Sequence, residues 1–172
     1  MVERGLNPGG FGAEDVQILR MQPSDLDEVL AIERVSFPTP WSRGAFMAEL
    51  FDSSRSCYLV AKLNGRVVGY IGVWLILDEA HITNIAVHPC YRRRGIGRKL
   101  LRSMMRVAAS RGAKRMTLEV RASNIGAQRL YEQLGFTSVG VRRGYYHDNN
   151  EDAIIMWKEG LPLGPDEGQA MI

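Results

Sequence analysis

Arginines and glycines between residues 88 and 101 carry the clearest chemical signal in the sequence. Arg92, Arg93 and Arg94 precede Gly95-Ile96-Gly97, with an apolar strand candidate before them and an amphipathic helix candidate after them. Glycine lets a backbone turn closely around a ligand. The first N–H groups of a helix have no partner within the helix and lie at the positive end of its dipole. The stretch therefore predicts a cradle for phosphate.

Two common phosphate-binding loops do not fit this stretch. A Walker P-loop requires Gly-Lys-Ser/Thr, whereas Lys99 lies between Arg98 and Leu100. A dinucleotide-binding fingerprint requires a third glycine where Leu100 stands. The pattern that remains, Arg92-x-x-Gly95-x-Gly97, is short. An ordinary strand-to-helix turn with a solvated basic face therefore stays open as an alternative.

Glu119 and Tyr131 are the candidates for acid–base chemistry. Glu119 lies in the middle of an apolar strand candidate, where glutamate is unfavourable. Its alternative interpretation is an exposed carboxylate paired with Arg121. Tyr131 shares a helix face with Asn124, seven residues earlier, and lies at the edge of an apolar stripe. Such a ring can pack while its hydroxyl points into a cleft, although a core tyrosine with a satisfied hydroxyl is the alternative.

Periodicity elsewhere predicts the elements that position these residues. Expected strands lie at residues 16–21, 58–63, 66–77, 82–87, 116–121, 137–143 and 152–158, and Asn64-Gly65 favours a type I′ hairpin turn. Expected helices run from 24 to 32 or 35, and over 45–51, 95–111 and 123–134, with Ser24 and Ser42 as caps of the first two. In the third helix, Gly112 is the expected stop, and the four-residue spacing predicts a core stripe of Ile96, Leu100, Met104 and Ala108. The class is α/β (α+β), with one domain over 15–159 and loose tails at 1–14 and 160–172.

Composition limits the function classes. The chain has 172 residues, 45% hydrophobic and 24% charged, which is typical of one soluble globular domain. The net charge of +3 favours an anionic ligand without requiring nucleic acid. Cys57 and Cys90 fit no metal-ligand spacing, and no secretory or membrane-spanning pattern is found, so a cytoplasmic protein with free thiols is expected. His81, His88 and His147 lack partners at ligand spacing, so no metal is expected.

Six further motifs follow one another along the chain: Phe37-Pro-Thr-Pro-Trp-Ser42, Asn84-Ile-Ala-Val87, Leu118-Glu-Val-Arg-Ala-Ser-Asn124, Leu130-Tyr-Glu-x-Leu-Gly-Phe136, Arg143-Gly-Tyr-Tyr146 and Glu151-Asp-Ala-Ile-Ile-Met156. In type and order they resemble the motifs of the bacterial ribosomal-protein-alanine N-acetyltransferases of the GNAT superfamily. The resemblance covers roughly residues 16 to 158. It implies the GNAT fold, a central mixed but mostly antiparallel sheet of about seven strands flanked by about four helices, and acetyl-CoA as co-substrate. Cys90, where the family usually has a polar residue, and the two tails are departures.

The resemblance also implies roles for individual residues. Glu119 would be the general base and Tyr131 the general acid. The cofactor would be held by Ile85, Ala86 and Val87 along the pantetheine arm, by Arg92, Arg93, Arg94, Gly95, Ile96, Gly97 and Arg98 at the pyrophosphate, and by Asn124. The peptide cleft would be lined by Trp41, Asn84, Tyr145 and Tyr146.

The implied function is acetyl transfer to a protein N-terminus, with the N-terminal alanine of small-subunit ribosomal protein eighteen as the expected acceptor. A neutral amine would attack the thioester directly, Glu119 would remove its proton, itself or through a water, and Tyr131 would protonate the departing sulfur. An α-amino group with a pKa near 8 is about one-tenth neutral at pH 7, whereas a lysine is under about 0.1% neutral. A monomer or weak dimer is expected.

Three alternatives remain open at this point. The first is a GNAT acetyltransferase that acts on lysine side chains or on broader N-termini. The second is a coenzyme A-binding module without catalysis, which the presence of both Glu119 and Tyr131 disfavours. The third is a ribosome- or RNA-binding protein whose functional surface is the basic stripe along the 95–111 helix, formed by Arg94, Arg98, Arg102 and Arg106 at four-residue spacing. That reading predicts steeply salt-sensitive RNA binding, and the sequence lacks the interleaved aromatic residues of single-strand binders.

Overall fold

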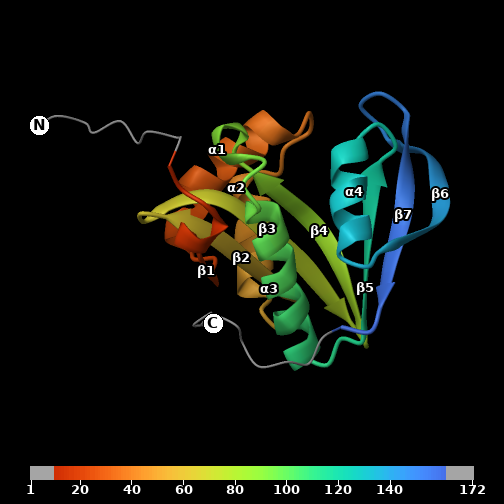
Figure 1. Ribbon diagram of the computed structural model, residues 1–172, viewed down its shortest axis with the longest axis horizontal. Helices are drawn as coiled ribbons and strands as arrows, with labels where there is room; N and C mark the ends of the chain where they lie inside the picture. The colour runs from red at the N-terminus through yellow and green to blue at the C-terminus, as the bar shows by residue number, and fades with distance from the viewer. Residues whose placement is uncertain (1–9, 162–172) are drawn as a thin grey trace, which may run out of the picture.

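The computed structural model describes residues 10–161, which form one seven-stranded sheet flanked by four α-helices (Figure 1). The strand order is β1-β2-β3-β4-β5-β7-β6, and every neighbouring pair is antiparallel except β4 and β5. The strands are β1 (Gln17–Arg20), β2 (Ser56–Leu63), β3 (Arg66–Ile76), β4 (Glu79–Val87), β5 (Arg115–Arg121), β6 (Thr137–Tyr146) and β7 (Glu151–Glu159). The helices are α1 (Leu26–Ser36), α2 (Arg43–Phe51), α3 (Ile96–Ser110) and α4 (Ile125–Gln133). The expected class and the mostly antiparallel sheet are confirmed.

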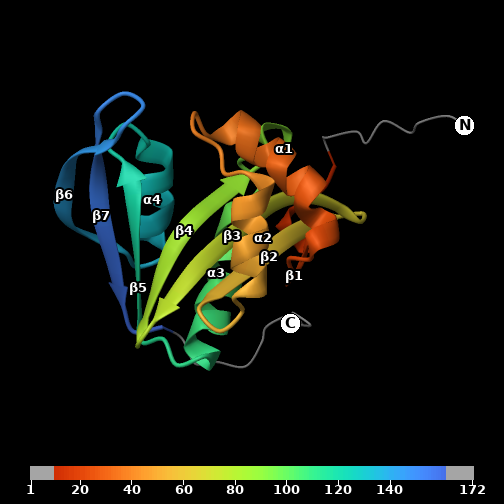
Figure 2. The ribbon, with the colours of Figure 1, turned by 180° about the vertical axis from the view of Figure 1, so that it is seen from behind.

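Helices cover both faces of the sheet. Helices α3 and α4 lie over one face (Figure 1), and α1 and α2 over the other (Figure 2). Strand β2 is buried from both sides, because Leu59 belongs to the core under α3 while Tyr58 and Val60 belong to the core under α1 and α2. Alternate strand residues point to opposite faces, so a strand covered twice is apolar throughout. None of the helices within residues 10–161 is long and apolar enough to cross a membrane.

Helix α3 follows the predicted pattern closely. The four residues of its expected core stripe are each at most 1% exposed; they are Ile96, Leu100, Met104 and Ala108. The helix ends where Gly112 takes a left-handed conformation with φ of 96°, and the Ala113 N–H donates to the Ala108 carbonyl. Glycine adopts this conformation without the steric penalty of a side chain, which confirms the predicted helix stop.

The hairpin between β2 and β3 also matches its prediction. Asn64 and Gly65 have φ of 50° and 79°, as a type I′ turn requires. In the connection between α1 and α2, Ser42 caps α2 by accepting a hydrogen bond from the Ala45 N–H at 3.1 Å, which confirms the second predicted cap.

The predicted cap of the first helix is wrong. Ser24 lies inside a short 3-10 turn, Pro23–Asp25, and α1 begins only at Leu26. The Asp25 carboxylate accepts a hydrogen bond from the Gln22 N–H at 2.8 Å, which closes this turn ahead of the helix. The helix continues to Ser36, beyond the predicted end.

Both ends of the described chain contact the domain. Residues 1–9 and 162–172 of the two predicted tails lie outside the described residues. Phe11, within the predicted first tail, packs on the core beside Tyr91, with ring centroids 5.4 Å apart. The N–H groups of Gly160 and Leu161 donate to the Lys114 carbonyl at 3.1 and 3.2 Å. Residues that contact the domain are therefore found before its predicted start at residue 15 and after its predicted end at residue 159.

Replacing Phe46 with alanine is expected to destabilise the fold by about 3–5 kcal/mol. The side chain is fully buried under α2 and makes ring contacts with Trp41, Tyr58 and Tyr70. Urea unfolding followed by circular dichroism measures the loss. The exposed Phe51, on the same helix, is the matched control, and Phe51→Ala is expected to change stability by less than about 0.5 kcal/mol. Equal losses for the two variants would contradict this account of the core.

Candidate active site

The site begins where the two parallel strands separate. Strands β4 and β5 pair only at Glu79 with Arg115, Ala80 with Met116 and His81 with Thr117. Beyond that point the strands diverge, as Figure 2 shows. The later residues of β4 and β5 therefore have no partner across this gap. The wider end of the gap is where side chains from both strands can face a ligand.

A cleft of about 270 Å³ occupies this position. Its walls come from β4, β5, the N-terminus and middle of α4, the end of β6, and the segment from the end of α1 to the start of α2. It is lined by Glu33, Ser36, Phe37, Pro38, Thr39, Trp41, Ile82, Thr83, Asn84, Ile85, Leu118, Glu119, Val120, Arg121, Asn124, Tyr131 and Tyr146. The fold thus brings together most of the residues predicted for catalysis and peptide binding.

Glu119 is a partly shielded carboxylate with a histidine and an arginine beside it. Its side chain is 8% exposed, and its Oε2 lies 2.7 Å from His81 Nε2. Arg142 Nη2 lies 3.7 Å from the other oxygen. The hydrogen bond from His81 lowers the pKa of Glu119, against the opposing effect of burial. The carboxylate is therefore ionised at neutral pH and can accept a proton.

The expected alternative pairing of Glu119 with Arg121 is wrong. Arg121 is bound by Asp148, in the turn between β6 and β7, at 2.9 Å and by Glu151, the first residue of β7, at 3.4 Å. His81, for which the sequence suggested no role other than the rejected one of metal ligand, lies beside Glu119 instead. It is brought there by the parallel pairing of His81 with Thr117, a register that no single stretch of sequence reveals.

Tyr131 is buried in α4 yet reaches the cleft. Its side chain is 6% exposed, and its ring packs near Phe136 with centroids 5.8 Å apart. Burial raises the pKa of Tyr131, and the neighbouring Tyr146 adds to the rise, so the phenol stays protonated at neutral pH. Its hydroxyl has no hydrogen-bond partner within residues 10–161. No described protein group therefore satisfies this hydroxyl, as the alternative of a core tyrosine would require.

The opposite wall of the cleft holds a buried polar group. Glu33 is 2% exposed; it accepts a hydrogen bond from the Trp41 N–H at 3.0 Å and another from the Tyr70 hydroxyl. Burial raises the pKa of Glu33, while the Trp41 N–H and the nearby Asn84 amide offset part of that effect. Asn84 is 8% exposed, and its Nδ2 makes no hydrogen bond of normal geometry to the described part of the chain. A buried amide donor at a cleft is available to a ligand carbonyl.

The arginine loop lies outside this cleft. Arg93 and Gly95 have left-handed conformations, with φ of 62° and 79°, and they bend the chain into the start of α3. Three of the four arginines already have partners: Arg92 donates to the Val87 carbonyl and Ser36, Arg94 lies 4.3 Å from the ring centroid of Phe11, and Arg98 donates to Gln133. Arg93 is exposed and has no such partner among residues 10–161.

Besides the residues of the arginine loop, three predicted residues do not line the cleft. Tyr145 is 40% exposed, and Arg142 lies 5.6 Å from the centroid of its ring. Ala86 is buried in the core under α1 and α2, and Val87 contacts the core under α3. No group of three or more histidine, cysteine or acidic side chains within the described range could hold a metal ion.

Comparison with known proteins decides the family. The model of the acetyltransferase (GNAT) family matches residues 26–136. The chain belongs to the GNAT acetyltransferase family. One relative, the [ribosomal protein bS18]-alanine N-acetyltransferase of Escherichia coli (strain K12), is 39% identical over 148 residues, covering 85% of this chain and 97% of that protein. A Bacillus subtilis (strain 168) protein, provisionally named for the same activity, is 43% identical over 140 residues, covering 81% and 93%.

The fold agrees with a solved member of the family. The crystal structure of the ribosomal-protein-S18-alanine N-acetyltransferase from Escherichia coli superposes with a TM-score of 0.77 at 35% identity. The match covers 90% of this GNAT chain and 99% of that one. The similarity therefore extends over most of the described fold.

Membership of the GNAT acetyltransferases implies acetyl-CoA as the acetyl donor, and the site residues fit it. Beyond His81, β4 is not paired with β5. The peptide groups on the edge of β4 that faces the gap can therefore hydrogen-bond to the amide groups of the pantetheine arm. The bend at Arg93 and Gly95 leads directly into α3, whose first N–H groups suit a diphosphate. Acetyl-CoA supplies an electrophilic thioester carbonyl when it is bound.

Proposed function

We propose that this GNAT acetyltransferase acetylates the α-amino group of the N-terminal alanine of ribosomal protein bS18, in the cytoplasm. The observation that carries the proposal is the meeting of Glu119 and Tyr131 in one cleft. These two groups come from β5 and α4, and the chain that brings them together spans nearly the whole length of the Escherichia coli relative named for this activity.

Glu119 acts as the general base. Its carboxylate is ionised, lines the cleft, and is held by His81 and Arg142. An ammonium group cannot attack a carbonyl, so the incoming amine has to lose a proton before or during attack. Glu119 takes that proton, directly or through one water. The hydrogen bond at 2.7 Å makes His81 a positioning residue for this carboxylate.

Tyr131 acts as the general acid. Its raised pKa keeps the proton on the phenol, and no internal partner within residues 10–161 competes for its hydroxyl. When the carbon–sulfur bond of the tetrahedral intermediate breaks, the departing coenzyme A thiolate needs a proton donor close by. Tyr131 donates to that sulfur. Base and acid thus lie on different elements of the same cleft, as direct transfer requires.

The remaining residues of the site bind the two substrates. The backbone of Ile85, Ala86 and Val87 pairs with the pantetheine arm, Asn124 contacts the cofactor, and the loop Arg92, Arg93, Arg94, Gly95, Ile96, Gly97 and Arg98 binds the pyrophosphate. To bind phosphate, three of these arginines would give up their present contacts within the chain; they are Arg92, Arg94 and Arg98. Trp41, Asn84, Tyr145 and Tyr146 receive the acceptor peptide, and the free Asn84 amide donates to a peptide carbonyl.

Release of coenzyme A thiol with three matched peptides tests this proposal. One peptide begins with a free alanine in the bS18 context, the second is the same peptide with a blocked N-terminus, and the third is blocked and carries an internal lysine. Turnover with the first peptide alone is expected. Turnover with the blocked lysine peptide would assign the protein to lysine acetylation, and no turnover with any peptide would contradict the proposed acceptor.

Replacing His81 with glutamine is expected to move the acidic limb of the pH profile of kcat to higher pH. His81 lowers the pKa of Glu119, while burial raises it, so without the imidazole the carboxyl protonates at a higher pH. Because a base must be unprotonated, activity is then lost earlier as the pH falls. The exposed His147 provides the matched control, His147→Gln. A profile of the His81 variant that coincides with wild type would contradict the role of this pair.

A further inference from the structure

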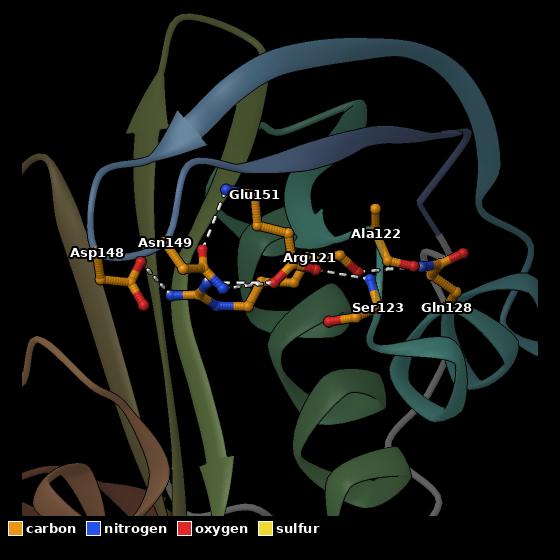
Figure 3. Close-up of polar contacts among 7 residues, drawn as sticks. All are labelled: Arg121, Ala122, Ser123, Gln128, Asp148, Asn149 and Glu151. Atoms are coloured by element: carbon orange, nitrogen blue, oxygen red, sulfur yellow. Dashed lines mark hydrogen bonds and ion pairs between the residues drawn. The ribbon is translucent and has the colours of Figure 1, made fainter.

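Arg121, at the end of β5, is the centre of a polar cluster that the proposed chemistry does not use (Figure 3). Its guanidinium donates to Asp148 at 2.9 Å, to Asn149 at 3.2 Å and to Glu151 at 3.4 Å. The side chains of Asp148 and Glu151 are only 19% and 17% exposed. Several charged and polar groups joined in one network hold their geometry better than an isolated surface pair does.

The same cluster reaches the start of α4. Glu151 Oε2 accepts a hydrogen bond from the Ser123 N–H at 2.7 Å, while Gln128 Nε2 donates to the carbonyls of Arg121 and Ala122 at 3.1 and 3.0 Å (Figure 3). The turn between β6 and β7 is thereby joined to the junction of β5 and α4. Both Glu119 and Tyr131 lie within a few residues of that junction.

Arg121 also supports Tyr146. The guanidinium carbon lies 4.0 Å from the centroid of the Tyr146 ring, a cation–π contact. The end of β6 that carries this tyrosine is paired irregularly with β7, although Tyr146 itself pairs with Glu151. Strand β6 is at the edge of the sheet, and its register with β7 breaks between Arg142 and Tyr146. The Arg121 contact therefore supplies support that regular strand pairing does not.

We propose that Arg121 is a positioning residue that sets Tyr146 against the cleft and so determines acceptor-peptide binding. Arg121, Tyr146 and Glu119 line the same cleft. Because Asp148 and Glu151 already neutralise the guanidinium, Arg121 does not serve as an anion-binding group. It acts through the Tyr146 ring and the β6–β7 turn. This inference rests on the proposed function, since it assigns the cleft to a peptide.

Steady-state kinetics of Arg121→Ala test the inference. The KM for the alanine peptide is expected to rise about tenfold, with the KM for acetyl-CoA unchanged. The matched control is Arg115→Ala, because Arg115 lies on the same strand, pairs with Asp78, Glu79 and Glu159, and is at the end of β5 away from the cleft. An unchanged peptide KM in Arg121→Ala, or an equal rise in Arg115→Ala, would overturn the inference.

A double-mutant cycle separates positioning from a general loss of structure. If Arg121 acts through the Tyr146 ring, Arg121→Ala should add little to the loss of peptide kcat/KM caused by Tyr146→Leu. Full additivity of the two losses would overturn the inference.

Amide hydrogen exchange of residues 144–151 tests the support of the turn without any acceptor. Arg121→Ala should speed this exchange and Arg115→Ala should not. If wild type acetylates no peptide, the proposed function fails while this measurement still decides whether Arg121 holds the turn. Unchanged exchange in Arg121→Ala would then overturn that role.

Discussion

Replacing Glu119 with glutamine is expected to lower kcat by roughly 10²–10³-fold. Glutamine preserves the size of the side chain and can still bond to His81, but its amide cannot accept the amine proton. The KM for acetyl-CoA should stay close to wild type, because Glu119 is not among the residues assigned to the cofactor. Stopped or continuous assays of thiol release at saturating substrates measure the effect.

The matched control for this variant is Glu79→Gln. Glu79 lies on the neighbouring strand at the closed end of the gap, 3.9 Å from Arg115. Its replacement should leave kcat near the wild-type value. If Glu119→Gln retained wild-type kcat, Glu119 would not be the base, and a site that binds coenzyme A without using this carboxylate would have to be considered again.

Replacing Tyr131 with phenylalanine is expected to lower kcat by about 10²-fold with little loss of stability. The phenol is buried, so its ring supports the core, but its hydroxyl bonds to no described residue. Removing an unpartnered hydroxyl breaks no hydrogen bond in the folded protein. The measurements are kcat and the thermal unfolding midpoint of the same preparation.

Tyr70→Phe is the matched control for Tyr131→Phe, because it removes the hydroxyl of another buried tyrosine. The Tyr70 hydroxyl donates to the buried Glu33, so its removal leaves that carboxylate with one partner fewer. We expect it to lose about 1–3 kcal/mol of stability while keeping most of its kcat. A Tyr131→Phe variant that lost stability but kept kcat would contradict the assignment of Tyr131 as the acid.

Local signals predicted much of this fold. The four-residue spacing from Ile96 to Ala108 predicted the buried face of α3, and Asn64-Gly65 predicted its hairpin turn, because both depend on neighbours in the sequence. Ser24 was assigned as a cap on the same grounds and proved wrong. Asp25 bonds back to Gln22 and starts a turn that competes with the cap.

The partners of the site residues were harder to predict. The motifs around Glu119 and Tyr131 predicted which residues meet in the cleft. They did not predict that His81 binds Glu119, since that contact depends on the parallel register of β4 and β5. Arg121 was considered as a partner of Glu119, whereas its true partners lie about 27 residues later in a turn. Long-range pairing of charged groups is set by tertiary structure, to which strand periodicity is insensitive.

The position of the acetyl group on one peptide tests the central claim most directly. The peptide carries the bS18 N-terminal sequence with a free alanine and one internal lysine, so that both amines compete in the same reaction. Fragmentation mass spectrometry of the product then locates the acetyl group. We predict acetylation at the alanine nitrogen in wild type and its near absence in Glu119→Gln. Acetylation at the lysine, or an unmodified peptide after incubation with wild type, would contradict the claim.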